Sequence, residues 1–180
     1  MKADDAILDA FEKEIDELAI NLLTHAPLAS DLRLITVAMK ICHDLERVGD
    51  EATTIARWVA DLNQFPRLAT GTDPAGMASL GLVMLKEALE AFVNGDTAGA
   101  RAVIPRDKQL DAANRQLHLE LKGHMTWDST RIPCCLHWMT ISKSLERIGD
   151  HAKNIAEEVV YLHEGRDIRH AAESRPRRVD

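Results

Sequence analysis

The sequence has few aromatic residues and no long apolar run. Only 4% of its 180 residues are Phe, Trp or Tyr, and long stretches consist of Ala, Leu, Ile, Glu, Asp and Lys, which favour helices. No run of about twenty apolar residues is present, and the acidic, periodic start does not resemble a signal peptide. These absences predict a helical protein of the cytoplasm.

Basic residues are also scattered, apart from a few near the C-terminus, and the formal net charge is −7. Direct binding to nucleic acid requires a basic face, so this class is not expected. The sequence also has no P-loop, no glycine-rich phosphate cradle and no nucleophile with a matching base, which argues against an enzyme.

The sequence has only three cysteines, Cys42, Cys134 and Cys135. They lie in apolar runs without a CxxC spacing. This pattern predicts reduced thiols in a core rather than a disulfide framework or a zinc site.

Apolar residues recur at intervals of three and four, which predicts amphipathic helices. The five expected helices cover about residues 3–25, 31–65, 75–93, 97–124 and 133–163. Ser30 or Asp31 is expected to cap the second helix, and Pro105 lies in the first turns of the fourth, where proline is tolerated.

One acidic, glycine-containing phrase occurs twice: LERVGDEATTIA at 45–56 returns as LERIGDHAKNIA at 145–156. The phrase lies on the second helix of the first half but on the third helix of the second half. The expected divisions are a first, two-helix repeat at 1–66, a linker at 67–74, a second, three-helix repeat at 75–165 and a flexible tail at 166–180.

The predicted fold is therefore all-α, with two antiparallel helix bundles related by the internal repeat, the first lacking its opening helix. A bundle without one helix exposes an apolar seam. The other half, a dimer mate or a preceding segment is expected to cover it.

Each copy of the phrase carries two carboxylates four residues apart, which share one side of a helix. Helical geometry places Glu146, Asp150 and Glu157 opposite the apolar side of the last helix, so they are expected to face outward. Several such pairs can bind a hard or borderline cation, such as magnesium, manganese, iron or zinc. The candidate ligands are Glu46, Asp50, Glu146 and Asp150, with the preceding pairs Asp5 and Asp9, Glu12 and Asp16, and Asp107 and Asp111.

Other repeated residues accompany the acids. Arg47 and Arg147 can balance charge or receive a phosphate. Glycine follows at 49 and 149, each costing about 1 kcal/mol relative to alanine inside a helix, which predicts close packing on that backbone.

Several polar side chains are weaker candidates. His151 and Asn154 are possible auxiliary ligands, although position 54 is Thr where position 154 is Asn. The side chains expected on helix surfaces or boundaries are His43, His137 and His163.

Two alternatives remain open. The acids can form a solvated face of a purely structural module. The second alternative is an enzyme with a di-metal carboxylate centre. Ferritin-like centres of this kind need Glu-x-x-His pairs that face the bundle core, a spacing that this sequence does not show.

The repeated phrase, together with PLASDLRLITVAMKI at 27–41 and DSTRIPCCL at 128–136, closely resembles the PhoU family of phosphate-uptake regulators over nearly the whole chain. The resemblance implies two three-helix bundles with metal ions on their surfaces. The ligands it implies are Glu46, Asp50, Glu146 and Asp150, together with Asp5, Asp9, Asp107 and Asp111. It implies a homodimeric adaptor at the cytoplasmic face of the membrane. The implied partners are the ATPase subunit of the phosphate ABC transporter and the phosphate-sensing histidine kinase.

Overall fold

The computed structural model describes residues 2–25 and 28–169, with side chains from residue 7 onward, and this part of the chain contains helices and no strand. The all-α prediction is confirmed. The helices are α1 (Lys2–Leu23), α2 (Ala29–Leu62), α3 (Pro74–Asn94), α4 (Thr97–Val103), α5 (Asp107–Trp127) and α6 (Ile132–Glu164), with 3₁₀ turns at Ile104–Arg106 and Ser129–Arg131.

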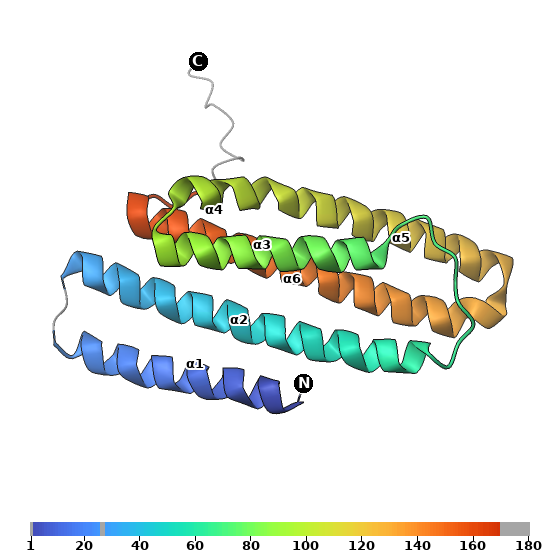
Figure 1. Ribbon diagram of the computed structural model, residues 1–180, viewed down its shortest axis with the longest axis horizontal. Coiled ribbons are helices and arrows are strands. Elements are labelled where there is room, and N and C mark those ends of the chain that lie inside the picture. The colour runs from blue at the N-terminus through green and yellow to red at the C-terminus, as the bar shows by residue number, and fades with distance from the viewer. Residues whose placement is uncertain (1, 26–27, 170–180) are drawn as a thin grey trace, which may run out of the picture.

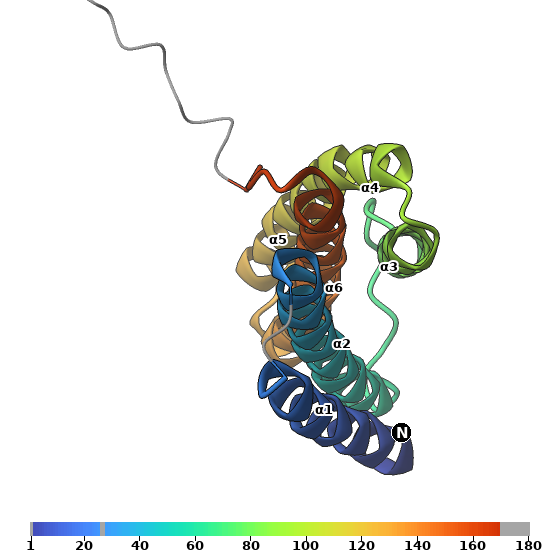
Figure 2. The same cartoon turned by 90° about the vertical axis from the view of Figure 1, so that its left-hand side faces the viewer.

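The molecule is elongated, and its two longest helices, α2 and α6, run antiparallel beside each other (Figure 1). Helix α6 also contacts α3, α4 and α5, whereas α1 packs on α2. Viewed from one end, α6 lies between α5, α3 and α2, and α1 lies beyond α2 at the far margin (Figure 2). The two copies of the phrase therefore face each other across the α2–α6 contact.

Local signals explain most helix ends. Helix α3 begins with Pro74 after Asp73, whose carboxylate accepts a hydrogen bond from the amide of Ala75, and it ends at Gly95, which has φ 65°. Asp96 caps α4 by accepting from the amide of Gly99.

Two predicted helix boundaries are wrong. Helix α2 begins at Ala29 after Leu28, without a side-chain cap, so Ser30 and Asp31 lie inside its first turn. The predicted helix 97–124 is interrupted, because Pro105 lies in the 3₁₀ turn that separates α4 from α5. Proline has no amide hydrogen for the helical ladder, so the chain tightens there before α5 begins.

The core joins α2 through α6 in one apolar cluster. Its members with no exposed surface include Val37, Met84, Val103, Leu110, Leu117, Leu121, Ile155 and Val159. Cys42, Cys134 and Cys135 are buried and free, as predicted, and burial raises the pKa of all three thiols. The cysteines contribute to packing.

Gly149 of α6 packs against α5. A Cβ at this position would overlap Cδ1 of Leu110, a side chain with no exposed surface. Cδ1 of Leu110 also lies 3.9 Å from the position that a Cβ on Gly81 of α3 would take. Leu110 therefore fills the space between two glycines, and the close packing expected at position 149 is confirmed.

The residues after α6 return to the bundle. Ile168 packs against the core, and Arg169 forms an ion pair with the buried Glu158 at 3.2 Å. The rest of the predicted tail, 170–180, lies outside the described residues. The division of the chain into domains stays a prediction.

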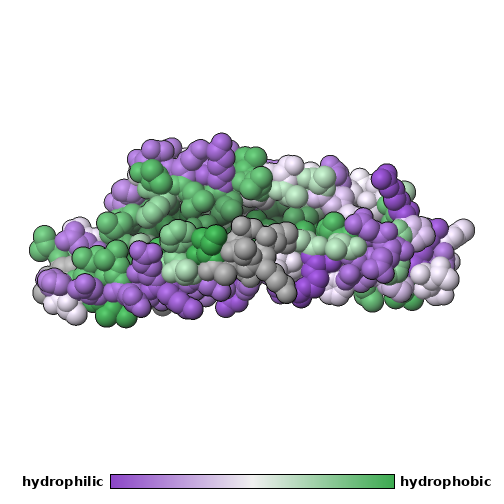
Figure 3. All heavy atoms as spheres, turned by 60° about the horizontal axis from the view of Figure 1, so that its bottom comes forward, coloured by the Kyte–Doolittle hydropathy of each residue, from purple (hydrophilic) through white to green (hydrophobic). Residues whose placement is uncertain are grey.

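Helix α1 exposes many large apolar side chains. Phe11 is 54% exposed and Leu18 is 57% exposed, so only part of the helix is covered by α2. Hydrophobic surface gathers between polar margins on this side of the molecule (Figure 3). None of the described helices is both long and apolar enough to cross a membrane.

We expect Gly149→Ala to lower the free energy of unfolding by about 1–3 kcal/mol, because the added methyl group overpacks Leu110 between α5, α6 and α3. Urea unfolding followed by circular dichroism measures the change. Gly123→Ala is the matched control: this glycine lies inside α5 with nothing within 4 Å of the added Cβ. It should stabilise by about 0.5–1 kcal/mol. Equal effects at both positions would contradict the packing role of Gly149.

Candidate metal-binding grooves

The first candidate lies in the groove between α5 and α6. The 3₁₀ turn around Pro105 ends at Arg106, and Asp107, the first residue of α5, is only 4% exposed. Oδ1 of Asp107 lies 3.7 Å from the position of a Cβ on Gly149. The missing side chain at 149 thus allows Asp107 to approach α6 between the positions of Glu146 and Asp150.

Three of the predicted carboxylates act on a fourth, Asp150, in this groove. Burial raises the pKa of Asp150, and the negative charges of Asp107, Glu146 and, more weakly, Asp111 raise it further, while Lys153 opposes them. Like charges interact in this way only at short range. The structure therefore places Asp107, Glu146 and Asp111 within electrostatic range of Asp150, and the metal site proposed for the second repeat stays a prediction.

Asp107 is only partly satisfied. Its Oδ2 accepts a hydrogen bond of 3.0 Å from Nζ of Lys153, whereas its Oδ1 is buried and has no hydrogen-bond partner among the described residues. A buried carboxylate oxygen without a donor is costly for folding. Such an oxygen, beside three further carboxylates, is a suitable ligand for a hard cation. The residues of this groove therefore fit a metal ion.

The outward orientation predicted for these acids is wrong in part. The prediction concerned Glu146, Asp150 and Glu157, of which the side chain of Glu146 is only 12% exposed and Glu157 is 7% exposed. Helix α6 has neighbours on several sides, so the face opposite its apolar stripe is covered as well. The carboxylates lie in a groove between helices and not on an open face.

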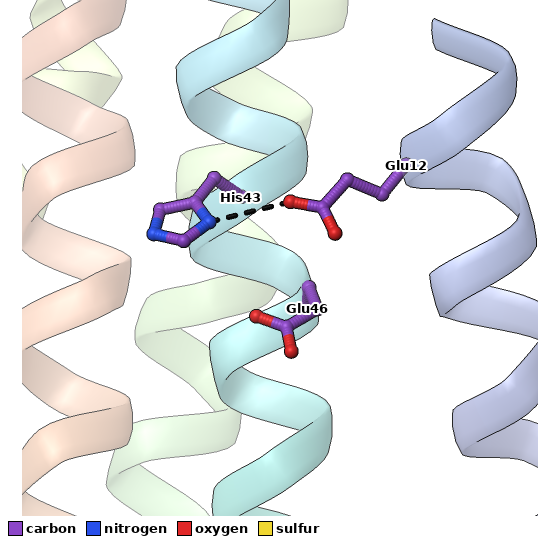
Figure 4. Close-up of side chains that lie close together, drawn as sticks. All are labelled: Glu12, His43 and Glu46. Atoms are coloured by element: carbon purple, nitrogen blue, oxygen red, sulfur yellow. Dashed lines mark hydrogen bonds and ion pairs between the residues drawn. The ribbon is translucent and has the colours of Figure 1, made fainter. Parts of the chain in front are cut away.

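The second candidate joins α1 to α2 in the first repeat. Glu12, His43 and Glu46 each offer a ligand atom, and these atoms lie within 4.8 Å of one another, as in no other group of three or more such residues in the described chain. Nδ1 of His43 is 3.3 Å from Oε1 of Glu12, and Glu46 points into the same space one turn further along α2 (Figure 4). A histidine with two carboxylates suits a borderline cation such as zinc, iron or manganese.

The predicted partners of Glu46 are more open. Asp9 is exposed, the side chain of Asp50 is 53% exposed, and the side chain of Asp5 lies outside the part that the structure describes. Burial raises the pKa of Glu46, as do the charges of Asp50 and Glu12, while Arg47 and His43 lower it.

The sequence missed His43 as a ligand candidate. It correctly expected this residue on a helix surface, where its side chain is 56% exposed. The available signal was the spacing of three between His43 and Glu46, which places both side chains on one face of α2. An acid of α1 lies opposite that face. Nothing in the sequence states which turn of α1 lies opposite.

The accessory residues of the phrases pair with different neighbours. Arg47 pairs with the acids of its own helix turn: its guanidinium group lies 3.5 Å from Glu46 and 3.7 Å from Asp50. Arg147 instead donates to Glu51 of α2 at 2.9 Å.

Two proposed auxiliary ligands of the second phrase also contact α2. Nδ1 of His151 lies 2.8 Å from Asp44, and the amide of Asn154 donates to the same carboxylate oxygen at 3.4 Å. The structure pairs both residues with Asp44 across the α2–α6 contact, away from Asp107.

The fold and the grooves define a class of protein: a helical bundle built from two related segments, with repeated acidic phrases lining the spaces between helices. A family model described as the PhoU domain matches residues 1–59 and 75–159. The chain belongs to the PhoU family.

Relatives and solved structures agree with this assignment. The phosphate-specific transport system accessory protein PhoU homologue of Rhizobium meliloti is 40% identical, over 91% of this chain and 70% of that protein. The crystal structure of PhoU from Pseudomonas aeruginosa superimposes with a TM-score of 0.88 at 38% identity, covering 92% of this chain and 80% of that one. The phosphate transport system regulatory protein PhoU from Streptococcus pneumoniae gives a TM-score of 0.82 at 32% identity, covering 92% and 78%.

We expect Asp150→Asn to stabilise the metal-free protein at neutral pH. Because the pKa of Asp150 is raised in the folded state, its ionisation opposes folding at pH values above that pKa. Asparagine removes this penalty, so the gain should shrink as the pH falls and vanish below the ordinary aspartate pKa of 3.8. Urea midpoints in EDTA at pH 7.5 and pH 3.5 measure it. A gain that is independent of pH would contradict the electrostatic origin, and Glu90→Gln on exposed α3 surface is the control.

Proposed function

We propose that this protein regulates phosphate uptake and phosphate-starvation signalling as a metal-binding adaptor without catalytic activity. Membership of the PhoU family, a family of regulatory accessory proteins, supports a role in phosphate uptake. The single observation that favours metal binding is the buried Oδ1 of Asp107, which lacks a hydrogen-bond donor among the described residues.

Two groups of residues would hold the ions. Asp107, Asp111, Glu146 and Asp150 supply oxygen ligands between α5 and α6. Glu12, His43 and Glu46 supply a mixed set between α1 and α2, with Asp5, Asp9 and Asp50 on the same helices. A bound divalent or trivalent ion would neutralise the repulsion among these acids, so it would stabilise the contact between the paired helices.

In this proposal the metal ions stabilise the packing of the helices, and the surface of the helices binds the partner proteins. The proposed partners are the ATPase subunit of the phosphate ABC transporter and the phosphate-sensing histidine kinase, which the protein restrains at the cytoplasmic face of the membrane. The exposed apolar side chains of α1 support association of two copies into a homodimer.

A second candidate is the same adaptor without a metal in the α5–α6 groove. Lys153 supports it, because its ammonium group already supplies a positive charge to Asp107 at 3.0 Å. The pKa of Lys153 is raised: burial lowers it, but the hydrogen bond and ion pair with Asp107 outweigh burial. The first repeat has Thr53 at the corresponding position and no such internal cation.

Metal analysis separates the two candidates. Protein incubated with excess manganese, iron or zinc and then gel-filtered should retain ions in stoichiometric amounts, measured by inductively coupled plasma mass spectrometry. Asp107→Asn with Asp150→Asn should remove the ion of the α5–α6 groove, and Glu12→Gln with His43→Ala that of the α1–α2 groove. At a hundredfold excess over Kd, the ion should stabilise the fold by about 2.7 kcal/mol.

Lys86→Ala, a change at an exposed α3 residue, is the control and should leave the metal content unchanged. If both double variants retain the metal ions, these grooves are excluded as the metal sites. If the unaltered protein retains no stoichiometric metal, the second candidate is favoured.

The adaptor function is tested by affinity capture. The full chain should retain the transporter ATPase subunit and the cytoplasmic part of the sensor kinase from the same bacterium, and an ATPase subunit of an unrelated importer should pass through. Capture is measured with and without EDTA, which shows whether metal contributes to recognition. Binding to neither partner would sink the proposed function, whatever the metal content.

A further inference from the structure

A second kind of site lies between α2 and α6, apart from the acidic α5–α6 groove. A cleft of about 630 Å³ opens between the C-terminal half of α2 and the N-terminal half of α6, and three cationic side chains line it: Arg47, Lys143 and Arg147. The two arginines occupy corresponding positions of the repeated phrase. Because α2 and α6 run antiparallel, both arginines reach the same cleft (Figure 1).

The arginines retain unused donors. Arg47 lies 3.5 Å from Glu46 and 3.7 Å from Asp50 but makes no hydrogen bond to a described residue. Arg147 makes one, from Nη1 to Glu51. A guanidinium group has five N–H donors in a planar fork, which matches the oxygens of a phosphate group. Most of these donors are therefore available to a ligand in the cleft.

The cleft also contains hydroxyl groups without partners. Ser144 is 3% exposed, lines the cleft and makes no hydrogen bond to any described residue. Thr54, opposite it on α2, has none either within the described chain. A serine or threonine inside a helix commonly returns its hydroxyl to a backbone carbonyl, as Thr140 does to Leu136 at 3.0 Å. The free hydroxyl of Ser144 is thus an additional donor beside the arginines.

The internal repeat provides a comparison. At the other end of the α2–α6 contact, the related cleft has Asp44 where this one has Ser144, and Asn154 where this one has Thr54. Asp44 accepts a hydrogen bond from Asn154 and contacts His151, so these polar groups satisfy one another. The cations of that cleft, Lys40 and Arg169, both pair with Glu158. In the cleft of Arg47 and Arg147, serine replaces that aspartate and leaves donors unpaired.

We propose that the Arg47–Arg147 cleft binds a phosphate group, with Arg47, Lys143 and Arg147 supplying charge and Ser144 and Thr54 supplying hydroxyl donors. Asp50 and Glu51 also line the cleft and position the two guanidinium groups. Arg47 and Lys143 also form ion pairs with Glu46 and Glu146, just outside the cleft, so the attraction for an anion depends on the unused donors of the arginines and hydroxyl groups. The site goes beyond the regulatory function proposed above and needs no bound metal.

Isothermal titration of the full chain in EDTA at low ionic strength tests the site. Inorganic phosphate and, in a separate arm, ATP are the probes, since the phosphate group can be free or part of a nucleotide. We expect saturable binding that weakens as sodium chloride is added. Arg47→Gln and Arg147→Gln should each weaken it about tenfold, because each removes charge-assisted hydrogen bonds.

Ser144→Asp should abolish binding, because it copies the acid of the related cleft. Lys86→Ala removes a cation from the exposed surface of α3 and should bind like the unaltered protein. Circular dichroism checks that each variant is folded, and if Ser144→Asp is not, the two arginine variants decide. The site is supported if the unaltered protein binds phosphate or ATP and the arginine variants and Ser144→Asp bind the same probe more weakly or not at all.

No binding of phosphate or ATP would overturn the proposal, as would binding that both arginine variants retain in full. Failure here leaves capture of the transporter subunit and the kinase unaffected, so it is distinguishable from failure of the proposed function.

Discussion

The structure depends on the packing of α6 against its neighbours. Ala152, Ile155, Ala156, Val159 and Val160 have no exposed surface, and small or β-branched side chains bring α2, α3 and α5 close to this helix. Each fully buried Val or Ile contributes about 1.5–3 kcal/mol through removal of apolar surface from water. Because α6 also carries the second copy of the phrase, the same packing that stabilises the bundle decides where its acids lie.

Local sequence patterns predicted the repeat, the helices and their apolar faces, because each of these features depends on residues of one helix or one phrase. Burial of Cys134 and Cys135 and close packing at Gly149 follow from the same local patterns. The break between α4 and α5 could not be predicted. The apolar spacing continues through Pro105, and one tight turn hardly changes the direction of the chain (Figure 1), so the periodicity records no interruption.

Within the candidate site, spacing of four predicted which acids share a helix side but not their surroundings. A helical projection assumes one buried face, whereas α6 is covered on several, so Glu157 is buried. The partnership of Lys153 with Asp107 and that of His43 with Glu12 depend on which turns of two helices meet. This register is decided by side-chain packing between helices, which no single-helix pattern contains.

The two copies of the phrase share the E-R-x-G-D core at 46–50 and 146–150, so their differences arise from the positions around this core. Lysine at 153 in place of threonine at 53 adds a cation beside the acids of the second repeat. Serine at 144 in place of aspartate at 44 removes an anion beside the arginines. In a partly buried groove, adding or removing one charged side chain changes the Coulomb energy of a bound ion considerably. A single substitution on a common frame can therefore change whether a groove favours a cation or an anion. The shared E-R-x-G-D core therefore preserves the frame, and the residues around this core differentiate the two halves.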